Sequence, residues 1–534
     1  MNPRPYPQRH SQRGHSPWLC LSLLGGLLLA GYATLSLAAE RRAGSLQTLA
    51  TLGRELESQH GIRFTVDADL GRDTVQPPSG SAPRAADIPV LLKGYNWIGT
   101  YGADGRLTTV HITGRNGDGQ DAGDSHRGKP LITYRKRPRA LPARYAGYPT
   151  QSVYPIDIPV KRLRAMRKGA DVTLNLPRGT FLLRHDQTWA HRNGDTTWAA
   201  RLSEANSGLA SRTLLTLTDA AQVEGQINTP DGLYLVESDA TGQWLIDLKA
   251  SGLLPGRLDQ DASPPFFLAP PAAPTITAGA GPAQAIGAAG PGALPSPATA
   301  AQQTRINVLL LLPASGLTPS GHDETRLNLL LALANQALLD SRISVSLQLA
   351  GVERLAQAAQ GDNHQLLVQL STQQAAFDQV QTLRERHAAD LVMLVHPFSA
   401  SSATSSCGEA WVNGSNATVL SPALSYAVVS DGRAGGYYCS NYTLAHELGH
   451  LLGAAHDRPH AAVAGHFPYS FGYGLPGHFG DIMSYIDPEA GLYANPELHD
   501  CFGFACGIAI GQPGAADVAS TLRLTAPIVA GFAP

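Results

Sequence analysis

Apolar positions in residues 305–534 alternate between two patterns. INVLLLLP (306–313) and ADLVMLVHPF (389–398) are continuous apolar runs, which are typical of strands buried on both faces. DETRLNLLLALANQALLDSR (323–342) has the apolar spacing of a helix, and SVSLQLAGV (344–352) alternates as a strand does. Strands separated by helices in this order predict an α/β domain with a mixed sheet and crossover helices.

A different pattern fills residues 151–253 and predicts a β-rich domain. DVTLNL (171–176) and LYLVES (233–238) alternate between apolar and polar positions, and Gly, Asn and Asp interrupt the chain at short intervals. We find no catalytic constellation in this region. Its position before the last domain favours a propeptide or a targeting module.

Residues 40–115 predict a small α/β module. Leucines recur at helical spacing until Gly61, where a helix would stop, and IRFTV (62–66) then alternates like a strand. Two further strand patterns flank GADG (102–105), which is a hairpin signal.

Two segments lack a periodic apolar face, and we expect both to be linkers. Residues 116–150 are polar and then basic, with RKRPR at 135–139. A solvated linker is the favoured interpretation there, and a processing site for another protease is the alternative. Residues 254–304 are rich in Pro, Ala and Gly and cannot bury enough surface to offset the entropy of ordering.

The first residues, 1–39, have the parts of a secretory signal peptide. Three arginines precede the apolar run WLCLSLLGGLLLAGYATLSLAA (18–39), which ends in small residues before the charged ERR. An uncleaved membrane anchor is the alternative, because the run is nearly as long as the roughly 20 residues that span a bilayer. Glycines and hydroxyl residues dilute the run, so cleavage near Ala38 or Ala39 is favoured, and we expect an exported protein in the periplasm or the medium.

Charge and cysteine content add to this picture. The formal net charge of -2 gives no sign of a nucleic-acid surface. Beyond the signal region the chain has four cysteines, Cys407, Cys439, Cys501 and Cys506. An even number in an exported protein predicts two disulfides. Three pairings exist, and the closeness of Cys501 and Cys506 favours 501–506 with 407–439.

The chemistry concentrates in AHELGHLLGAAHD (445–457). On a helix, His446 and His450 stand one turn apart on the same face, the spacing that two imidazoles need to share a metal ion. Glu447 can then reach a metal-bound water without being a ligand. Gly453 lets the chain leave the helix, and His456 can return as a third ligand. Three protein ligands with an open position are typical of catalytic zinc, here one Zn²⁺.

The reaction expected of this set is hydrolysis. Zinc lowers the pKa of its water toward about 7 and polarises a carbonyl. Glu447 is the candidate general base, which passes the proton to the leaving nitrogen. The remaining histidines downstream, His460, His466, His478 and His499, are expected to be loop or surface residues.

HELGHLLGAAHD resembles the zinc-binding helix of the metzincin peptidases. Asp457 after the third histidine is similar to the adamalysin, or reprolysin, branch, and DIMSY (481–485) resembles the Met-turn of these enzymes. The likeness extends over most of 305–534 and is greatest to bacterial reprolysin-like metallopeptidases. It implies a metzincin-like catalytic fold and places Met483 beneath the zinc.

The resemblance leaves some points open. Tyr485 is more like the tyrosine of astacins and serralysins, which is a fifth zinc ligand, and here it is either a ligand or a packed side chain. SYAVVSD (425–431) is implied as the edge strand that receives a substrate peptide. Residues 91–114 resemble the small N-terminal domain of secretins and TonB-dependent receptors, which implies a cell-envelope partner for the N-terminal half.

These observations predict an exported zinc-dependent endopeptidase acting on proteins or peptides. A zinc hydrolase of a non-protein amide is one alternative, because the same chemistry hydrolyses other amides. A catalytically idle metallopeptidase fold that serves as a binding module is the other, and the intact base argues against it.

Overall fold

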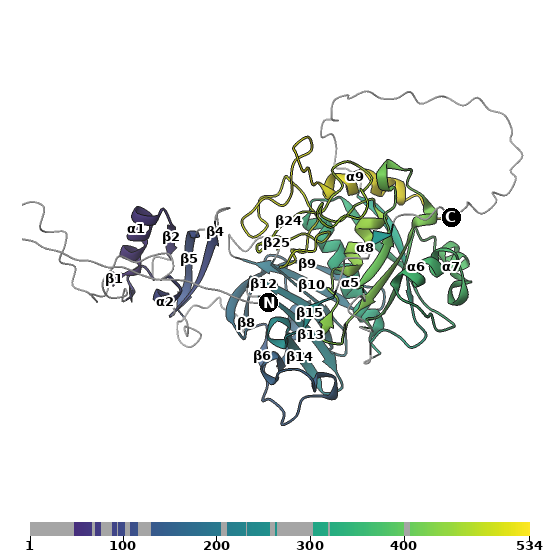
Figure 1. The fold of residues 1–534 in the computed structure, drawn as a ribbon. Helices are drawn as coiled ribbons and strands as arrows, with labels where there is room; N and C mark the ends of the chain where they lie inside the picture. The colour runs from purple at the N-terminus through teal and green to yellow at the C-terminus, as the bar shows by residue number, and fades with distance from the viewer. Residues whose placement is uncertain are drawn as a thin grey trace, which may run out of the picture. The chain divides into compact units, whose positions relative to one another are not determined.

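The computed structural model describes residues 47–66, 70–75, 88–92, 94–101, 107–115, 130–203, 211–230, 232–256, 262–263, 303–318, 321–399 and 406–534. The chain divides into two compact units, Met1–Gln120 and Asp121–Pro534 (Figure 1). The expected signal peptide lies outside the described residues. Within the described part of the chain, no helix has both the length and the apolar character needed to span a bilayer.

The first unit contains a small α/β module. Helix α1 (Leu49–His60) begins at Thr48, whose hydroxyl accepts from Thr51 N–H, and ends at Gly61 with a φ of 67°. A three-stranded sheet has the order β2 (Arg63–Val66), β5 (Leu107–Arg115), β4 (Tyr95–Tyr101). The predicted helix, its stop at Gly61 and the strand at 62–66 are confirmed.

The second unit opens with a nine-stranded antiparallel sheet, which we call the β-domain. Its order is β6-β7-β14-β13-β12-β11-β10-β9-β8. The strands are β6 (Thr133–Tyr134), β7 (Val153–Asp157), β8 (Asp171–Leu176), β9 (Gly179–Ala190), β10 (Thr196–Leu202), β11 (Arg212–Leu217), β12 (Val223–Thr229), β13 (Gly232–Asp239) and β14 (Gly242–Asp247). Short helices α3 (Val160–Arg164) and α4 (Leu248–Ser251) complete it. The two strands predicted from the alternating patterns at 171–176 and 233–238 are present as β8 and β13.

The basic segment before β7 belongs to the β-domain, so the expectation of a linker across 116–150 is wrong for its described part. β6 pairs with β7, and Leu131 and Ile132 are buried in the core of the sheet. Arg135 donates to two main-chain carbonyls, those of Ile156 at 3.1 Å and Gln243 at 3.1 Å. The arginines therefore bind the backbone of neighbouring strands, which a count of charges along the sequence does not reveal.

The rest of the unit is built on a six-stranded mixed sheet with the order β16-β20-β21-β19-β17-β18. The strands are β16 (Ala262–Ser263), β17 (Thr304–Leu312), β18 (Val345–Arg354), β19 (Leu391–Pro397), β20 (Gly408–Trp411) and β21 (Tyr426–Asp431). β17, β18, β19 and β21 are parallel, and β20 runs antiparallel to β21. The expected mixed sheet with buried strands is present.

Two expectations need correction on this sheet. SYAVVSD (425–431) is not an edge, because β21 lies between β20 and β19 and is paired on both sides. On this side of the sheet, β20 is the outermost strand that comes from residues 305–534. The short β16 pairs along the outer edge of β20. β16, with β15 (Leu254–Pro255), comes from the segment expected to be a linker, so the described parts of 254–304 are not free of structure.

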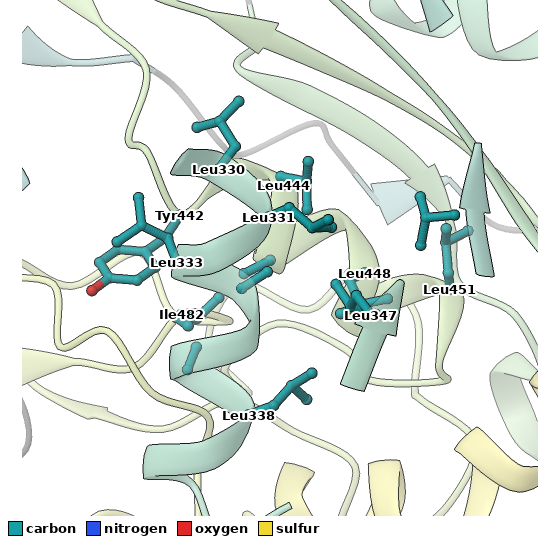
Figure 2. Packing of buried hydrophobic residues seen from close by; sticks show 14 of the residues in the cluster. Leu330, Leu331, Leu333, Leu338, Leu347, Tyr442, Leu444, Leu448, Leu451 and Ile482 are labelled. Carbon is teal, nitrogen blue, oxygen red and sulfur yellow. The ribbon is translucent and has the colours of Figure 1, made fainter. Parts of the chain in front are cut away.

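Helix α5 (Asp323–Asp340) lies between the two sheets (Figure 1). It contacts β10, β11 and β12 of the β-domain on one side, and β18 and α8 (Thr443–Leu451) on the other. Leucines of α5 pack in one core with Leu444, Leu448 and Leu451 of α8 (Figure 2). The remaining helices of the domain are α6 (Asn363–Ser371), α7 (Val380–Arg386) and α9 (Val518–Val529).

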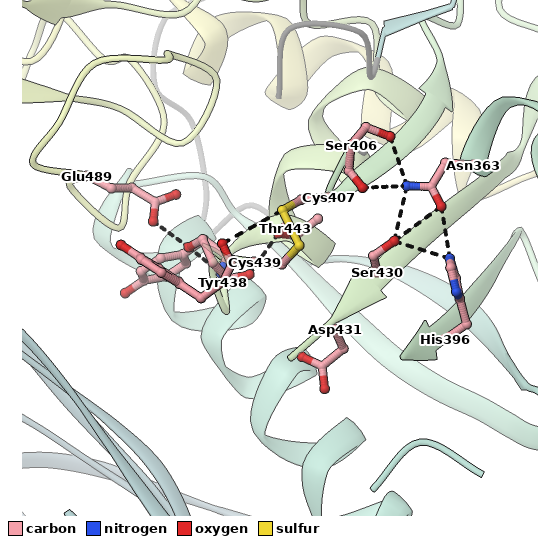
Figure 3. Close-up of a disulfide and its surroundings, with 12 residues drawn as sticks. Asn363, His396, Ser406, Cys407, Ser430, Asp431, Tyr438, Cys439, Thr443 and Glu489 are labelled. Carbon is pink, nitrogen blue, oxygen red and sulfur yellow. Dashed lines mark hydrogen bonds between the residues drawn. A yellow bond between two sulfur atoms is a disulfide. The ribbon is translucent and has the colours of Figure 1, made fainter. Parts of the chain in front are cut away.

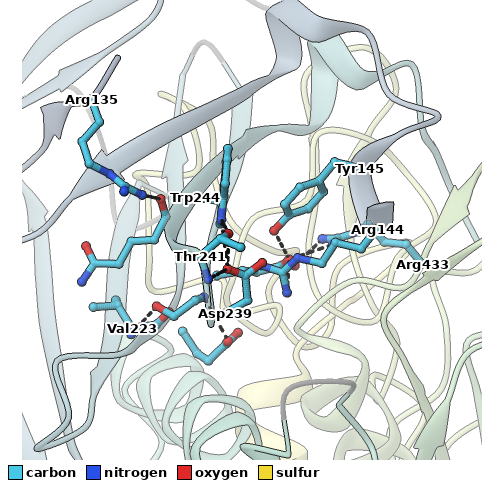
Figure 4. Close-up of polar contacts among 12 residues, drawn as sticks. Arg135, Arg144, Tyr145, Val223, Asp239, Thr241, Trp244 and Arg433 are labelled. Atoms are coloured by element: carbon cyan, nitrogen blue, oxygen red, sulfur yellow. Dashed lines mark hydrogen bonds and ion pairs between the residues drawn. The ribbon is translucent and has the colours of Figure 1, made fainter. Parts of the chain in front are cut away.

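Ion pairs join the β-domain to helix α5 and to β22 of the metallopeptidase part of this unit. Arg212 of β11 is buried and meets Asp340 of α5 through two contacts, one of 2.7 Å from its Nε. Arg433 of β22 (Arg433–Ala434) donates to Glu237 of β13 at 2.9 Å, and Tyr145 donates to the same carboxylate at 2.9 Å (Figure 4). The two parts of this unit thus share both an apolar core and buried charges.

Candidate metal centre

Helix α8 positions the first two candidate ligands. His446 and His450 lie one turn apart, and both are almost fully buried because α8 packs on α5 and on β20 and β21. Tyr493 donates to the carbonyl of Ala445 at 2.6 Å, which fixes the start of that turn. The predicted helix and the shared face of the two imidazoles are both present.

The outer nitrogens of the two rings fix their orientation. His446 Nδ1 lies 2.6 Å from the carbonyl oxygen of Ile482, and His450 Nδ1 lies 2.9 Å from that of Ala454. A carbonyl only accepts, so each Nδ1 carries the proton and each Nε2 presents its lone pair. The two Nε2 atoms face each other at 3.1 Å.

Gly453 turns the chain so that His456 can join them. Its φ of 88° is a left-handed conformation that glycine adopts without strain, and its carbonyl accepts from His466 N–H at 2.8 Å. The Nε2 of His456 then lies 2.9 Å from that of His450 and 3.2 Å from that of His446. The three histidines of the sequence motif therefore lie next to one another in the structure.

This set fits a metal ion. Zinc–nitrogen bonds of about 2.0–2.1 Å in a tetrahedron place neighbouring ligand atoms about 3.3 Å apart. The three Nε2 atoms are separated by 2.9 to 3.2 Å. Lone pairs brought this close repel one another unless a cation lies between them, and a nitrogen-only donor set suits zinc among the common catalytic metals.

Met483 and Asp457 connect the 481–485 turn to α8 and to the chain that follows this helix. Met483 is fully buried, and a Cβ built on Gly449 would collide with its Sδ, so the thioether packs directly against α8. Asp457 N–H donates to the carbonyl of Met483 at 3.1 Å, and its carboxylate accepts from Tyr485 N–H at 3.2 Å. The helix exit and the 481–485 turn are thereby tied together.

Tyr485 lies beside His456, and His460 lies beside Tyr485. The Tyr485 hydroxyl is 2.8 Å from the Nε2 of His456, and its ring lies 4.5 Å from that ring. His460 is exposed, as expected, yet its Nδ1 is 2.8 Å from the Asp457 carboxylate and its ring is 5.2 Å from that of Tyr485. The expectation that His460 is a loop residue holds, and the structure also places it beside the site.

Glu447 lies against the edge strand. A Cβ built on Gly408, the first residue of β20, would collide with the Glu447 carboxylate. The preceding residue, Cys407, forms a disulfide with Cys439 (Figure 3). The second disulfide joins Cys501 and Cys506. Both predicted pairings are confirmed, and the first one fixes the strand end next to Glu447.

A cavity of about 750 Å³ opens beside the triad. One wall comes from the metal-centre side, with Ser484, Tyr485 and His460, and the other comes from the β-domain, with Asn228 and Lys249. The β-domain thus contributes directly to the cavity that Tyr485 and His460 line, which its sequence did not indicate.

Two carboxyl groups near the centre, the buried Asp481 and the half-buried Glu489, escaped the sequence analysis. Burial raises the pKa of Asp481 to about 8, although its carboxylate accepts from Ala494 N–H at 2.7 Å. Burial also raises the pKa of Glu489, which lines the cavity, to about 7. Asp481 heads the DIMSY motif, so its position was visible in the sequence, whereas its burial was not.

The other histidines lie away from the triad. His466 contacts the carbonyl of Gly414 at 3.1 Å, the ring of His478 packs on Phe504 at 4.6 Å, and His499 is exposed. These residues are therefore structural or surface residues, as expected.

Comparison with known proteins agrees with this geometry. The description "Metallo-peptidase family M12B Reprolysin-like" matches residues 314–510, which contain the triad and the 481–485 turn. The chain carries a reprolysin-like metallopeptidase domain. A second description, "BamI lipocalin-like domain", matches residues 136–250 and so coincides with the β-domain.

Curated relatives and solved structures are similar to part of this chain. A "Peptidyl-Asp metalloendopeptidase" of Pseudomonas aeruginosa is 28% identical over 267 residues, covering 45% of this chain and 42% of the relative. One of the same name from Xanthomonas campestris is 30% identical over 243 residues, covering 44% and 52%. The chain thus spans about half the length of the curated relatives it matches. A crystal structure of metalloproteinase-II from Bacteroides fragilis aligns at 13% identity with a TM-score of 0.33, covering 55% of this chain and 87% of that one.

Proposed function

We propose that the chain is an exported, zinc-dependent endopeptidase. The observation that carries the proposal is the convergence of three imidazole Nε2 atoms within 3.2 Å of one another. Glu447 directly follows the first of these histidines, His446, on the same helix. Export is supported by the pattern of residues 1–39 and by the two disulfides, which persist in oxidising compartments.

His446, His450 and His456 are the proposed ligands. The carbonyls of Ile482 and Ala454 hold the first two rings in the tautomer that presents Nε2. The contact of the Tyr485 hydroxyl with His456 supports a position of this hydroxyl next to the metal ion rather than a role as a packed core side chain. When bound, zinc would supply Lewis-acid polarisation of the scissile carbonyl and a water of lowered pKa.

Glu447 is the proposed general base. From the turn between His446 and His450 its carboxylate takes the proton of the attacking water and delivers it to the leaving nitrogen. Its carboxylate lies against Gly408 at the start of β20, which supports a path for an extended peptide along the edge of that strand. We therefore assign peptide binding to β20 rather than to residues 425–431.

The substrate class follows from the relatives only as a proposal. Their name refers to peptide bonds at aspartate, and the cavity wall of this chain contains one lysine among its described residues, Lys249. Carboxylates at Asp487 and Glu489 line the same cavity, so the lining alone does not select an acidic side chain.

The test is hydrolysis by the purified mature chain of unfolded casein, of a peptide pair that differs only by Asp or Asn, and of an N-acyl amino acid. We expect cleavage of casein, loss of cleavage on chelation, and recovery with one equivalent of zinc. Cleavage of the N-acyl amino acid without casein would favour the non-protein amide. Zinc binding without any hydrolysis by the chain, or by a chain relieved of inhibition as described below, would favour an idle fold.

A further inference from the structure

Two short described segments that follow the β-domain in the chain, 254–256 and 262–263, pair with strands of the metallopeptidase domain. β15 pairs in parallel with β23 (Tyr437–Tyr438). The N–H of Leu254 donates to the carbonyl of Gly436 at 3.0 Å, and that of Gly256 donates to Tyr438 at 2.7 Å. We call the described residues 254–256 and 262–263 the strap.

The strap touches the residue that precedes the edge strand. A Cβ built on Gly256 would collide with the Sγ of Cys407 and would lie 3.2 Å from the carbonyl oxygen of Tyr438. Only a residue without a side chain approaches the disulfide this closely. The strap is therefore fitted to this surface.

The second part of the strap occupies the edge itself. Ala262 is paired with Ala410 and Ser263 with Trp411, in parallel register. The N–H of Val412 donates to the carbonyl of Ser263 at 3.1 Å. Outward-facing main-chain groups at the end of β20 are thus already bonded.

A side-chain contact fastens this pairing. The hydroxyl of Ser263 donates to the buried carboxylate of Glu409, which also lies 2.6 Å from the Nδ1 of His364. A hydrogen bond to a carboxylate is stronger than one between neutral groups. The strap thus has a specific anchor on the edge strand, apart from the metal ligands.

The occupied edge is the one that leads to the candidate base. β20 begins at Gly408, against the Glu447 carboxylate, and ends at Trp411, against Ser263. A peptide that adds to β20 needs the same main-chain donors and acceptors that the strap holds. One edge cannot serve two strands at the same residues.

The strap is also held at high local concentration. α4 immediately precedes it and is capped by Asp247, whose carboxylate accepts from Ala250 N–H at 2.9 Å. Leu253 packs with Trp244 and Tyr438 in one apolar cluster. A segment tethered this closely has an effective concentration of the order of millimolar.

We infer that the strap is an intramolecular competitor for the peptide-binding edge, and that its release from β20 controls access of substrate. This inference rests on the proposed function. The partner that it excludes is an extended peptide, and the device uses main-chain hydrogen bonds and Ser263 rather than a metal ligand.

The first variant is Gly256→Leu, which places a side chain where Cys407 leaves no room and so lifts the strap. The matched control is Gly147→Leu in the β-domain, where a Cβ would meet nothing within 4 Å. A second, milder variant is Ser263→Ala, which removes the donor to Glu409 and guards against misfolding of the first.

Binding and hydrolysis are measured separately. In a Glu447→Gln background, the affinity for a fluorescent extended peptide is measured by anisotropy, and hydrogen exchange is followed in the segment 406–412. With Glu447 intact, kcat/KM is measured on a quenched peptide. We expect Gly256→Leu to raise peptide affinity and kcat/KM about tenfold or more and to speed exchange at 406–412, since a millimolar competitor is removed. Ser263→Ala should act in the same direction but less, and Gly147→Leu should match the wild type.

The outcomes separate the two ideas. Tighter peptide binding without hydrolysis in any variant would support the strap and contradict the peptidase. If the wild type hydrolyses the peptide and neither strap variant raises hydrolysis or peptide affinity, the inference about the strap is wrong and the proposed peptidase function stands. Faster exchange at 406–412 without tighter binding, or no peptide binding by any variant, would also overturn it.

Discussion

Two buried polar centres in the same unit are built on opposite principles. At the domain interface, Arg212 and Arg433 each meet a carboxylate, Asp340 or Glu237, so that opposite charges are matched side chain to side chain. At the end of α8, three rings turn the same kind of nitrogen toward one point. Pairs of opposite charges hold the two domains together. Three nitrogen lone pairs that point at one another instead form a site for a metal ion. Removing an ion pair should lower the free energy of unfolding, and removing a histidine of the triad should lower catalytic activity.

The largest effect is expected for His450→Ala. Loss of one of three ligands should release the metal and lower kcat/KM by roughly 10³-fold or more, because a catalytic metal contributes several kcal/mol to the transition state. Metal content by plasma mass spectrometry and hydrolysis of a quenched peptide test this. The control is His478→Ala. The ring of His478 packs on Phe504, away from the triad, so this variant should keep one equivalent of bound metal. Full activity of His450→Ala would remove it from the ligand set.

Glu447→Gln should separate the metal from the proton transfer. The isosteric amide cannot accept the proton of the water, so kcat is expected to fall about 10²–10⁴-fold while one metal ion is retained. The same two measurements apply. Glu409→Gln is the matched carboxylate on the neighbouring strand, and by weakening the Ser263 contact it should raise hydrolysis rather than lower it. Equal losses in both variants would contradict the assignment.

Arg212→Met should act on stability alone. It leaves Asp340 buried without its guanidinium, and breaking such a pair costs about 3–5 kcal/mol. Chemical denaturation gives this value, and the folded fraction should bind metal as the wild type does. The double variant Arg212→Met, Asp340→Leu should recover most of the loss. A metal affinity that falls with stability would mean that the two centres are coupled.

Glu237→Gln should give a smaller, pH-dependent loss. Burial alone would raise the pKa of Glu237, but Arg433 and Arg144 outweigh it and lower the pKa from 4.5 to about 2. The folded state then favours the charged form, so the contribution is complete above pH 4.5 and disappears as the pH falls toward 2, with roughly 3 kcal/mol at most. Thermal melts at pH 7 and pH 3 should show the variant's deficit shrinking in acid. Glu385→Gln, an exposed site, should show no such change.

Met483→Leu is expected to have the smallest effect. The side chain is fully buried against Gly449, and a swap that conserves volume costs less than about 1.5 kcal/mol. Metal content should be unchanged. Release of the metal by this variant, measured as above, would show that the thioether does more than fill space.

The candidate site was readable from sequence where it depends on local spacing. His446 and His450 need only a helix, and His456 needs only the turn at Gly453. The carbonyl of Ile482, which orients His446, comes from a distant turn and has no side-chain signature. The edge strand was misplaced because β20 is only four residues long, GEAW, and has no clear apolar period.

The domain boundaries failed for a similar reason. Arg135 looks like part of a solvated basic run until its carbonyl partners are known. β15 and β16 have two residues each, too few for any period, and their strand character comes entirely from pairing with distant strands. Long elements with strong patterns, such as α5 and β17, were predicted correctly.

The position of α5 between the two sheets has a consequence for proteolysis. Cutting the peptide chain between 264 and 302 would sever the covalent connection, but α5 would still be covered by β10, β11 and β12 on one side and by β18 and α8 on the other. The product would be a two-chain protein whose pieces stay associated through native contacts, much like subunits. Maturation of such a protein could shorten the polypeptide on a gel without changing its mass in solution.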